Sequence, residues 1–331
     1  MNKPRVICIG EILIDRFSEQ PSESLQKVTS WQDFPGGAPA NTACALAKLG
    51  ISTTFIGCIA QDELGELLVN LLKDSGVDCT GVQRHHTAPT RTVYLVRDKT
   101  GNSKLVGFGG REPGEFADAY LCAELLPISL FQEVDWLVLG TLELAYPKSR
   151  EAVYKAISLA KFYDKKIFVD INWNPMFWIN IETAFQTIME LIKYVNFLKL
   201  TVDEAKFLFG TIKPKVIAQF FSNLKGVLVT AGESGCSYYL GEYEGNLPAF
   251  SVDVQNTTGA GDAFNAGIIS QILKYGIHSL ADPEIIRKIV TYASAVGTLT
   301  TMKLGAITSQ PTLIEVEVFL STHYLKRDSI S

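Results

Sequence analysis

The chain has 331 residues, of which 47% are apolar and 20% charged, a balance that predicts a globular fold with a substantial core and excludes a disordered chain. A formal net charge of −5 argues against nucleic acid or an anionic membrane as a partner, because an acidic protein repels both. No apolar run approaches the roughly 18 residues of a membrane span, and the first ten residues lack a signal-peptide pattern, so we expect a cytoplasmic protein.

The predicted strands are short apolar runs rich in β-branched residues, a pattern typical of strands buried on both faces of a sheet. They fall at 5–15, 53–60, 135–140, 165–172, 195–200 and 226–232. Helical patterns separate most of them, for example at 40–50, and at 62–76, which begins at the capping candidate Asp62. This alternation predicts an α/β fold with a doubly wound, mainly parallel sheet and helices on both faces. With no linker or repeat in the chain, we expect a single domain over residues 1–331.

Two segments interrupt the alternation. Residues 90–108 are typical of two strands joined by Lys-Thr-Gly-Asn at 99–102, and residues 15–35 form a polar connection. An antiparallel flap, or lid, built from about 11–35 and 88–112 accounts for both segments. In α/β enzymes such flaps often exclude water from a site.

A glycine-rich turn, NTTGAGDAFN at 256–265, precedes a helical pattern that ends at Gly276. The first N–H groups of a helix lack partners and its dipole is positive there, so bare backbone at Gly259, Ala260 and Gly261 suits a phosphate. Asp262 follows at once, placed to orient an attacking hydroxyl and accept its proton, because the proton can leave late in phosphoryl transfer. The alternative is that the glycines only permit tight packing and Asp262 is an ordinary first-turn acid.

Together with PGGAPANTACALAKLG at 35–50, this turn resembles the two signatures of the ribokinase-like, or PfkB, family of carbohydrate kinases. The resemblance runs from GEILID at 10–15 to KLGAITSQPT at 303–312, and DINWNPMFW at 170–178 and LKLTVDEAKFLFG at 198–210 make it most similar to the fructokinase branch. It implies a ribokinase-like fold and an ATP-dependent sugar kinase that phosphorylates the 6-hydroxyl of D-fructose. Another acceptor (2-keto-3-deoxygluconate, another hexose or a nucleoside) and a catalytically weak regulator that binds sugar or protein are the alternatives.

The resemblance also implies roles for individual residues. Asp262 would be the catalytic base, and the amides of Gly259, Ala260 and Gly261 the anion hole. The sugar site would comprise Asp15, Gly36, Gly37, Asn41 and Asn172. Separately, a strand-end cap, a turn and an early helix residue would explain Asp15, the two glycines and Asn41 equally well.

One departure from the fructokinase pattern concerns the sugar site. Asn174 stands where that branch usually has an arginine. Arg91 or Arg97 in the flap could substitute for it near the sugar, although each also fits a solvated strand position.

For the nucleotide, the resemblance implies contacts from TAGESG at 230–235, with Thr230, Gly232 and Gly235 as the candidates, and from Lys199. Glu204 would act on Mg²⁺ through water, because Mg²⁺ usually keeps several waters. The small-residue helix at 293–300 would flank the adenine. A plain strand-to-hairpin turn at 230–235 and a solvated helix acid at 204 are the alternatives.

A second departure concerns a monovalent cation. Asn256 replaces an aspartate that the family commonly has beside such an ion, which leaves activation by K⁺ open. The positions that would contribute oxygens are Thr258, Thr300, Gly305 and Ser309. The expected partners are a small sugar and ATP, and a homodimer through the flap is an alternative to a monomer.

Overall fold

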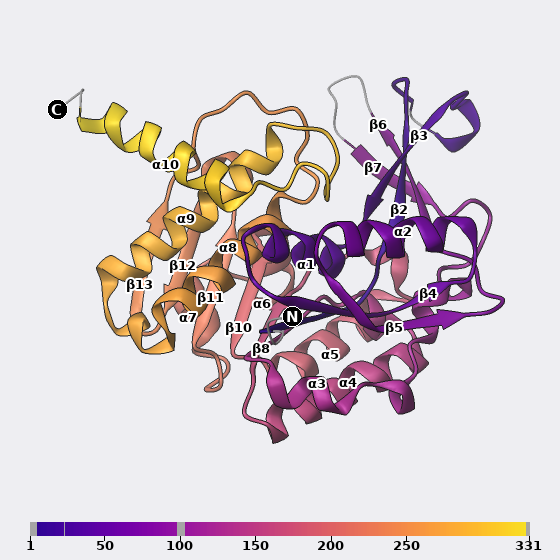
Figure 1. The fold of residues 1–331 in the computed structure, drawn as a ribbon, viewed down its shortest axis with the longest axis horizontal. Helices are drawn as coiled ribbons and strands as arrows, with labels where there is room; N and C mark the ends of the chain where they lie inside the picture. The colour runs from indigo at the N-terminus through magenta and orange to yellow at the C-terminus, as the bar shows by residue number, and fades with distance from the viewer. Residues whose placement is uncertain (1–4, 23, 98–102, 329–331) are drawn as a thin grey trace.

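The larger of two β-sheets organises the molecule (Figure 1). The computed structural model describes residues 5–22, 24–97 and 103–328. The larger sheet has nine strands, in the order β13 (Tyr243–Leu247), β12 (Cys236–Leu240), β11 (Gly226–Thr230), β10 (Phe197–Thr201), β9 (Lys166–Asp170), β8 (Trp136–Leu139), β1 (Val6–Ile9), β4 (Thr53–Ala60) and β5 (Asp78–His85). The strands from β11 to β5 are parallel to one another. β12 runs antiparallel to both of its neighbours, β11 and β13.

Helices cover both faces of this sheet, each over its own apolar cluster. One face carries α1 (Ala38–Lys48), α2 (Glu63–Asp74), α8 (Ala260–Tyr275) and α9 (Pro283–Thr301), on which α10 (Leu313–Asp328) packs. The other carries α3 (Ile128–Glu133), α4 (Pro147–Phe162), α5 (Ile181–Ile192), α6 (Val202–Phe209) and α7 (Pro214–Ala218). The predicted doubly wound, mainly parallel α/β architecture is confirmed. In the described parts of the chain, no helix combines the length and apolar character needed to cross a membrane.

The start of α2 shows how the sequence places these elements. Asp62 has extended backbone and its carboxylate accepts the N–H of Gly65, with an N···O distance of 2.7 Å, so it caps α2 as predicted. The same carboxylate accepts bonds from the N–H and hydroxyl of Thr90. One side chain therefore caps α2 and ties its first turn to the chain just before β6 (Thr92–Arg97).

The smaller sheet projects from the body at the upper right of Figure 1. Its order is β3 (Trp31–Gly36), β2 (Leu13–Ser18), β6 (Thr92–Arg97) and β7 (Ser103–Gly107). It is mixed rather than wholly antiparallel, because β2 and β6 run parallel. The predicted connecting turn at 99–102 lies outside the described residues. We call this sheet the lid sheet.

Two predictions here were wrong. Residues 5–15 are not one strand: the chain leaves the larger sheet after Ile9, passes through Gly10 at φ 152°, and enters the lid sheet as β2. Asp15 therefore lies within β2 rather than at the end of the first strand. Residues 15–35 are not merely a polar connection either, since they contain most of β2 and most of β3. The polar residues that hid these strands pair across them: Arg16 Nε lies 2.6 Å from Asp33 Oδ1.

Candidate active site

The start of α8 lies beside the catalytic candidate. Gly259 is the N-cap, with a left-handed backbone at φ 81°, and the helix begins at Ala260. The amide of Ala260 donates to the Thr257 carbonyl at 3.2 Å, whereas Gly261 and Asp262 follow within the first turn, where amides have no acceptor inside the helix. This geometry suits an anion over the turn. The assignment of these amides to an anion hole stays a prediction.

Asp262 is buried and reaches across to α1. Asn41 donates from Nδ2 to Asp262 Oδ2 at 2.8 Å, so two signatures that are far apart in sequence meet at this bond. Burial and then nearby Asp170 raise the pKa of Asp262 to about 7, although Asn41 and Lys199 oppose the shift. A carboxyl with a pKa near neutrality is well matched to accepting a proton at physiological pH. An ordinary exposed first-turn acid would not have this environment.

A buried ion pair lies beside Asp262 at the carboxyl ends of β9 and β10. Lys199 Nζ is 3.0 Å from Asp170 Oδ2, and Asn265 on α8 donates to the same oxygen at 2.7 Å. Burial alone would lower the pKa of Lys199, but Asp170 and then Glu204 raise it. A methyl group at Gly261 would lie 3.0 Å from Lys199 Nζ. The ammonium therefore lies against the glycine turn, where it can offset the charge of a phosphate.

The sugar-site candidates converge on the other side of Asp262. Asp15 packs so closely on β3 that a methyl group at Gly36 would lie 2.3 Å from its Oδ2. Burial raises the pKa of Asp15 to about 7, and Asp262 contributes to the rise. Gly37, at φ 108°, is the N-cap of α1, and a side chain there would meet the Glu11 carbonyl at 2.7 Å. The structure thus brings together Asp15, Gly36, Gly37 and Asn41 around Asp262, although their contact with a sugar stays a prediction.

Two buried glutamates near these residues, Glu11 and Glu143, were not predicted from the sequence. Glu11 Oε1 accepts the N–H of Ala38, the first residue of α1, at 2.9 Å. Burial raises its pKa to about 8, and burial and then Glu11 raise the pKa of Glu143 well above its usual range. Glu11 belongs to the GEILID segment and could have been noticed there. Glu143 carries no local signal, because only the fold brings it near Glu11.

Arg91 requires a correction. Its side chain has 0% exposure and forms a two-pronged ion pair with Asp118, with N···O distances of 2.5 and 2.7 Å. Its guanidinium lies 4.8 Å from the ring centre of Phe116 and 5.1 Å from that of Tyr146. It is therefore not a solvated strand residue. Its contact with the sugar in place of an arginine at 174 stays a prediction. The side chain of Arg97 lies outside the described part of the structure.

A cleft of about 1170 Å³ opens beside the glycine turn. It brings together the nucleotide candidates Lys199, Thr230, Gly232 and Gly235 with Asn172, Asp170, the Gly259–Asp262 segment, and Ser294, Gly297 and Thr298 of α9. Residues 230–235 also form the turn between antiparallel β11 and β12, so the structural and the nucleotide interpretations coexist. Asn172, predicted at the sugar, has a left-handed φ of 39° and lines this cleft. The volume suits a ligand of nucleotide size.

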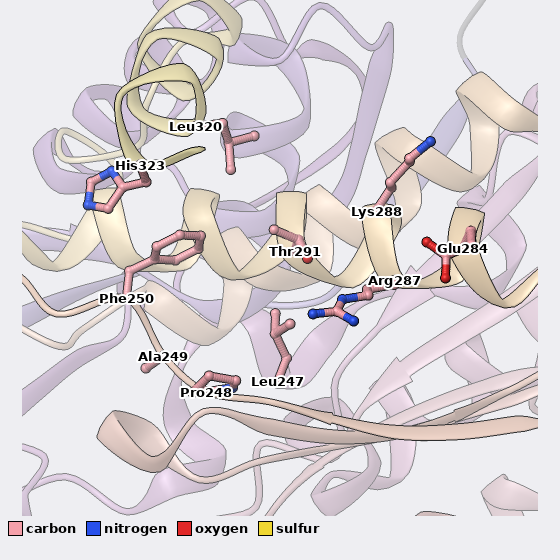
Figure 2. Close-up of a pocket in the computed structure, with 10 residues that line it drawn as sticks. All are labelled: Leu247, Pro248, Ala249, Phe250, Glu284, Arg287, Lys288, Thr291, Leu320 and His323. Carbon is pink, nitrogen blue, oxygen red and sulfur yellow. The ribbon is translucent and has the colours of Figure 1, made fainter. Parts of the chain in front are cut away.

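Figure 2 shows a second cavity, of about 300 Å³, next to this cleft. Arg287 and Thr291 of α9, Leu320 and the segment after β13 line it, and Phe250 lines both cavities. None of the predicted site residues lines the second cavity. The larger cleft is therefore the one that the candidate residues define.

Glu204 is not a solvated helix acid. Its two carboxylate oxygens accept the N–H groups of Trp173 at 2.8 Å and Thr201 at 2.7 Å, which makes it the last residue of a capping box on α6. It is buried, and burial raises its pKa. Each oxygen keeps a second lone pair, so a water-mediated contact with Mg²⁺ stays a prediction. Asp170, which lines the cleft, offers oxygen atoms of the kind that Mg²⁺ prefers, although the described residues contain no group of three or more side chains that could hold a metal ion directly.

The cation candidates lie in two segments that meet. The amides of Gln255 and Asn256 both donate to the Thr301 carbonyl, at 2.8 and 3.1 Å. Asn256 Oδ1 accepts the N–H of Thr258 at 2.7 Å, so this amide oxygen shapes its own turn. Thr300 and Ser309, which lie close to Thr301 in the sequence, are buried, and Gly305 has a left-handed backbone at φ 87°. The residues are compatible with an oxygen-lined ion site, which stays a prediction.

Comparison with known proteins agrees with this geometry. The pfkB family carbohydrate kinase domain matches residues 3–313. Probable fructokinase-2 of Arabidopsis thaliana is 33% identical over 322 residues, which cover 96% of each chain. The structure of Xylella fastidiosa fructokinase with bound ATP has a TM-score of 0.86 at 26% identity, covering 97% of this chain and 99% of that one. A Vibrio cholerae fructokinase double mutant with bound fructose, ADP and potassium ion has a TM-score of 0.82 at 26% identity, covering 96% and 98%.

The parallel sheet, the lid sheet and the glycine turn over a buried carboxylate define a kinase of the ribokinase-like fold. The chain belongs to the pfkB family of carbohydrate kinases and is an ATP-dependent sugar kinase.

Proposed function

We propose that the protein transfers the γ-phosphoryl group of ATP to the 6-hydroxyl of D-fructose. The observation that carries this proposal is the position of Asp262. It lies between the sugar-side residues Asn41 and Asp15 and the cleft that contains Lys199 and the glycine turn. The similarity to plant and bacterial fructokinases supports fructose as the acceptor. Residues 1–331 act, in this proposal, as one kinase domain with the lid sheet beside the sugar.

Asp15 and Asn41 hold the sugar so that its 6-hydroxyl faces the γ-phosphorus. The hydroxyl oxygen bonds to that phosphorus, the bond from phosphorus to the β–γ bridging oxygen breaks, and Asp262 accepts the hydroxyl proton. Lys199 and the amides at the start of α8 offset the negative charge on the phosphate oxygens. Mg²⁺, when bound, would neutralise the β- and γ-phosphates, with Asp170 and water-bridged Glu204 as the residues to hold it. Positioning of the two substrates can supply roughly 7 to 11 kcal/mol of the barrier reduction.

An ADP-release assay across a panel of acceptors tests the proposal. The panel contains D-fructose, 2-keto-3-deoxygluconate, other hexoses and nucleosides, with the Asp262→Ala protein as the blank for each. Coupling the product to phosphoglucose isomerase and glucose-6-phosphate dehydrogenase distinguishes fructose 6-phosphate from the 1-phosphate. Fructose turnover no higher than the blank would refute fructose as the acceptor, and another active sugar would replace it.

Activation by potassium forms part of the same proposal. The meeting of the 255–258 and 300–309 segments beside Gly259 supports it, as does the potassium ion in the Vibrio cholerae fructokinase structure. We expect KCl to raise turnover above that in choline chloride of equal ionic strength. Equal rates in the two salts would show that Asn256 does not support an activating ion.

A further inference from the structure

The last turn of α1 carries a lysine whose ammonium group contacts the main chain of another element. Lys48 Nζ lies 3.0 Å from the Ile307 carbonyl oxygen, 3.1 Å from that of Gln310 and 3.5 Å from that of Thr308. An ammonium group has three N–H donors and no acceptor, so it can serve all three carbonyls at once. The side chain is half-buried, and such charge-assisted bonds are stronger than bonds between neutral groups.

The segment that Lys48 holds is buried but has little regular structure. Ala306, Ile307, Ser309 and Gln310 are all at most 3% exposed, although they lie in a turn between α9 and α10. Carbonyl oxygens in such a position need partners, because a buried acceptor left unpaired destabilises the folded chain. Lys48 supplies donors that a helix or sheet would otherwise provide.

This segment supports the glycine turn directly. A methyl group at Gly259 would lie 3.0 Å from the Cα, Cβ and O atoms of Ala306. The Gln310 side chain donates from Nε2 to the Ala306 carbonyl at 2.7 Å and reaches the Gly259 carbonyl at 3.5 Å. The position of residues 305–310 therefore fixes the position of Gly259, and with it the amides at the start of α8.

Lys48 and Asn41 lie on the same helix, α1. Asn41 binds the carboxylate of Asp262, and Thr42 approaches the Asp262 carbonyl at 3.5 Å. One end of α1 thus contacts the catalytic candidate, and the other end holds the segment that packs against the glycine turn. A rigid helix between two such contacts keeps the spacing between the sugar side and the phosphate side constant.

We propose that Lys48 is a positioning residue: its ammonium group acts as a built-in cation that fixes residues 305–310 against Gly259 and so aligns the glycine turn with Asp262. This inference rests on the proposed function, because alignment matters only if phosphoryl transfer occurs at the turn. Lys48 touches neither substrate in this account. Its effect should therefore appear in turnover more than in the KM for the sugar.

The test compares Lys48→Ala with Lys48→Arg and with a control, Lys73→Ala. Alanine keeps helix propensity at this position, arginine keeps the charge and the donors, and Lys73 is an exposed lysine in the last turn of another helix. We expect Lys48→Ala to lower kcat about 10- to 100-fold, the effect of a small misplacement of reacting groups, with the KM for the sugar changed less than about threefold. We expect Lys48→Arg to keep most of the activity and Lys73→Ala to match wild type.

Two readouts separate positioning from general stability. n-Propylammonium, which restores the missing side-chain atoms, should raise kcat of Lys48→Ala, whereas tetramethylammonium, which has no N–H donor, should not. Amide hydrogen exchange should accelerate in peptides covering 303–312 and 256–263 and remain unchanged elsewhere. Unchanged kcat in Lys48→Ala, or exchange that accelerates throughout the molecule with no rescue by propylammonium, would overturn the proposal.

Failure of the proposed function gives a different result. Wild-type protein would then release ADP with fructose no faster than the blank, while the local change in hydrogen exchange would still report whether Lys48 holds the segment. An active wild type with an equally active Lys48→Ala variant would refute the role of Lys48 alone.

Discussion

The replacement Asp262→Asn tests the central step of the proposed reaction. It keeps the size of the side chain and an oxygen that can accept the Asn41 bond of 2.8 Å, but it removes the base. Loss of a positioned base typically costs about 10² to 10⁴ in turnover. We therefore expect kcat to fall by that factor while the dissociation constant for the sugar, measured by calorimetry, stays close to wild type.

The dependence of kcat/KM on pH tests the role of Asp262 in a second way. With the pKa of Asp262 raised to about 7 by burial and Asp170, the ionised fraction falls about tenfold for each pH unit below 7. For wild type, kcat/KM for the sugar should thus drop to about one hundredth of its plateau at pH 5. The asparagine variant should lose this dependence, except for what Asp15, whose pKa is also about 7, contributes through sugar binding.

The assay is ADP release at saturating ATP between pH 5 and pH 9, with Asp74→Asn as a control for loss of one exposed carboxylate distant in sequence from the site. Full turnover in the Asp262→Asn protein would remove Asp262 from the mechanism. A wild-type profile that stays flat to pH 5 would show that the carboxyl does not titrate near neutrality, and the account of its burial would be wrong.

Three other measurements test single contacts. Asp262→Asn should raise the free energy of unfolding at pH 8 by up to about 4 kcal/mol, because a native pKa raised from 3.8 to about 7 destabilises the ionised form of the folded protein. This gain should shrink as the pH falls below 7 and vanish near pH 4. Urea titrations at several pH values measure it. Arg91→Met should lower the free energy of unfolding by about 3 to 5 kcal/mol, because it leaves buried Asp118 without its counter-charge. Urea denaturation should show that adding Asp118→Leu recovers most of this loss. Gly259→Ala should lower the free energy of unfolding by about 1 to 2 kcal/mol, because alanine is strained in the left-handed backbone at φ 81°. It should also lower kcat by displacing Ala306. Calorimetry and the activity assay check the two effects, and a fully active variant with an unchanged melting temperature would contradict both.

The main sheet could be predicted because its strands are buried on both faces, and burial leaves continuous apolar runs. β4, for example, has all of its residues buried and was placed at its observed bounds. The lid strands were missed in part because they are half-exposed and carry polar residues such as Arg16 and Asp33 that stabilise one another only across strands. A pattern read along one strand cannot reveal a partner 17 residues away.

Part of the local geometry of the candidate site could be predicted, because a glycine and a carboxylate lie in one local motif: Gly259 is the N-cap of α8 and Asp262 lies in its first turn. Their roles in catalysis stay predictions. Glu143 could not be found, since its unusual environment depends on its burial near Glu11, which only the tertiary fold creates. Arg91 was misjudged for a related reason. A charged residue in a flap is expected in solvent, and only the folded chain supplies the buried Asp118 that accepts it.

The shifted carboxyls of the active site also change how the cleft receives a polyanion. The formal charge of −5 counts every acid as ionised, yet burial raises the pKa of Glu11 to about 8 and the pKa of Asp15 and of Asp262 to about 7. Burial also raises the pKa of Glu143 well above its usual range. Near pH 7 these groups therefore keep protons that the unfolded chain has released. Asp262, which lines the cleft, therefore carries only part of its negative charge near pH 7 before substrate arrives, which reduces the electrostatic repulsion that a triphosphate would otherwise meet on entry.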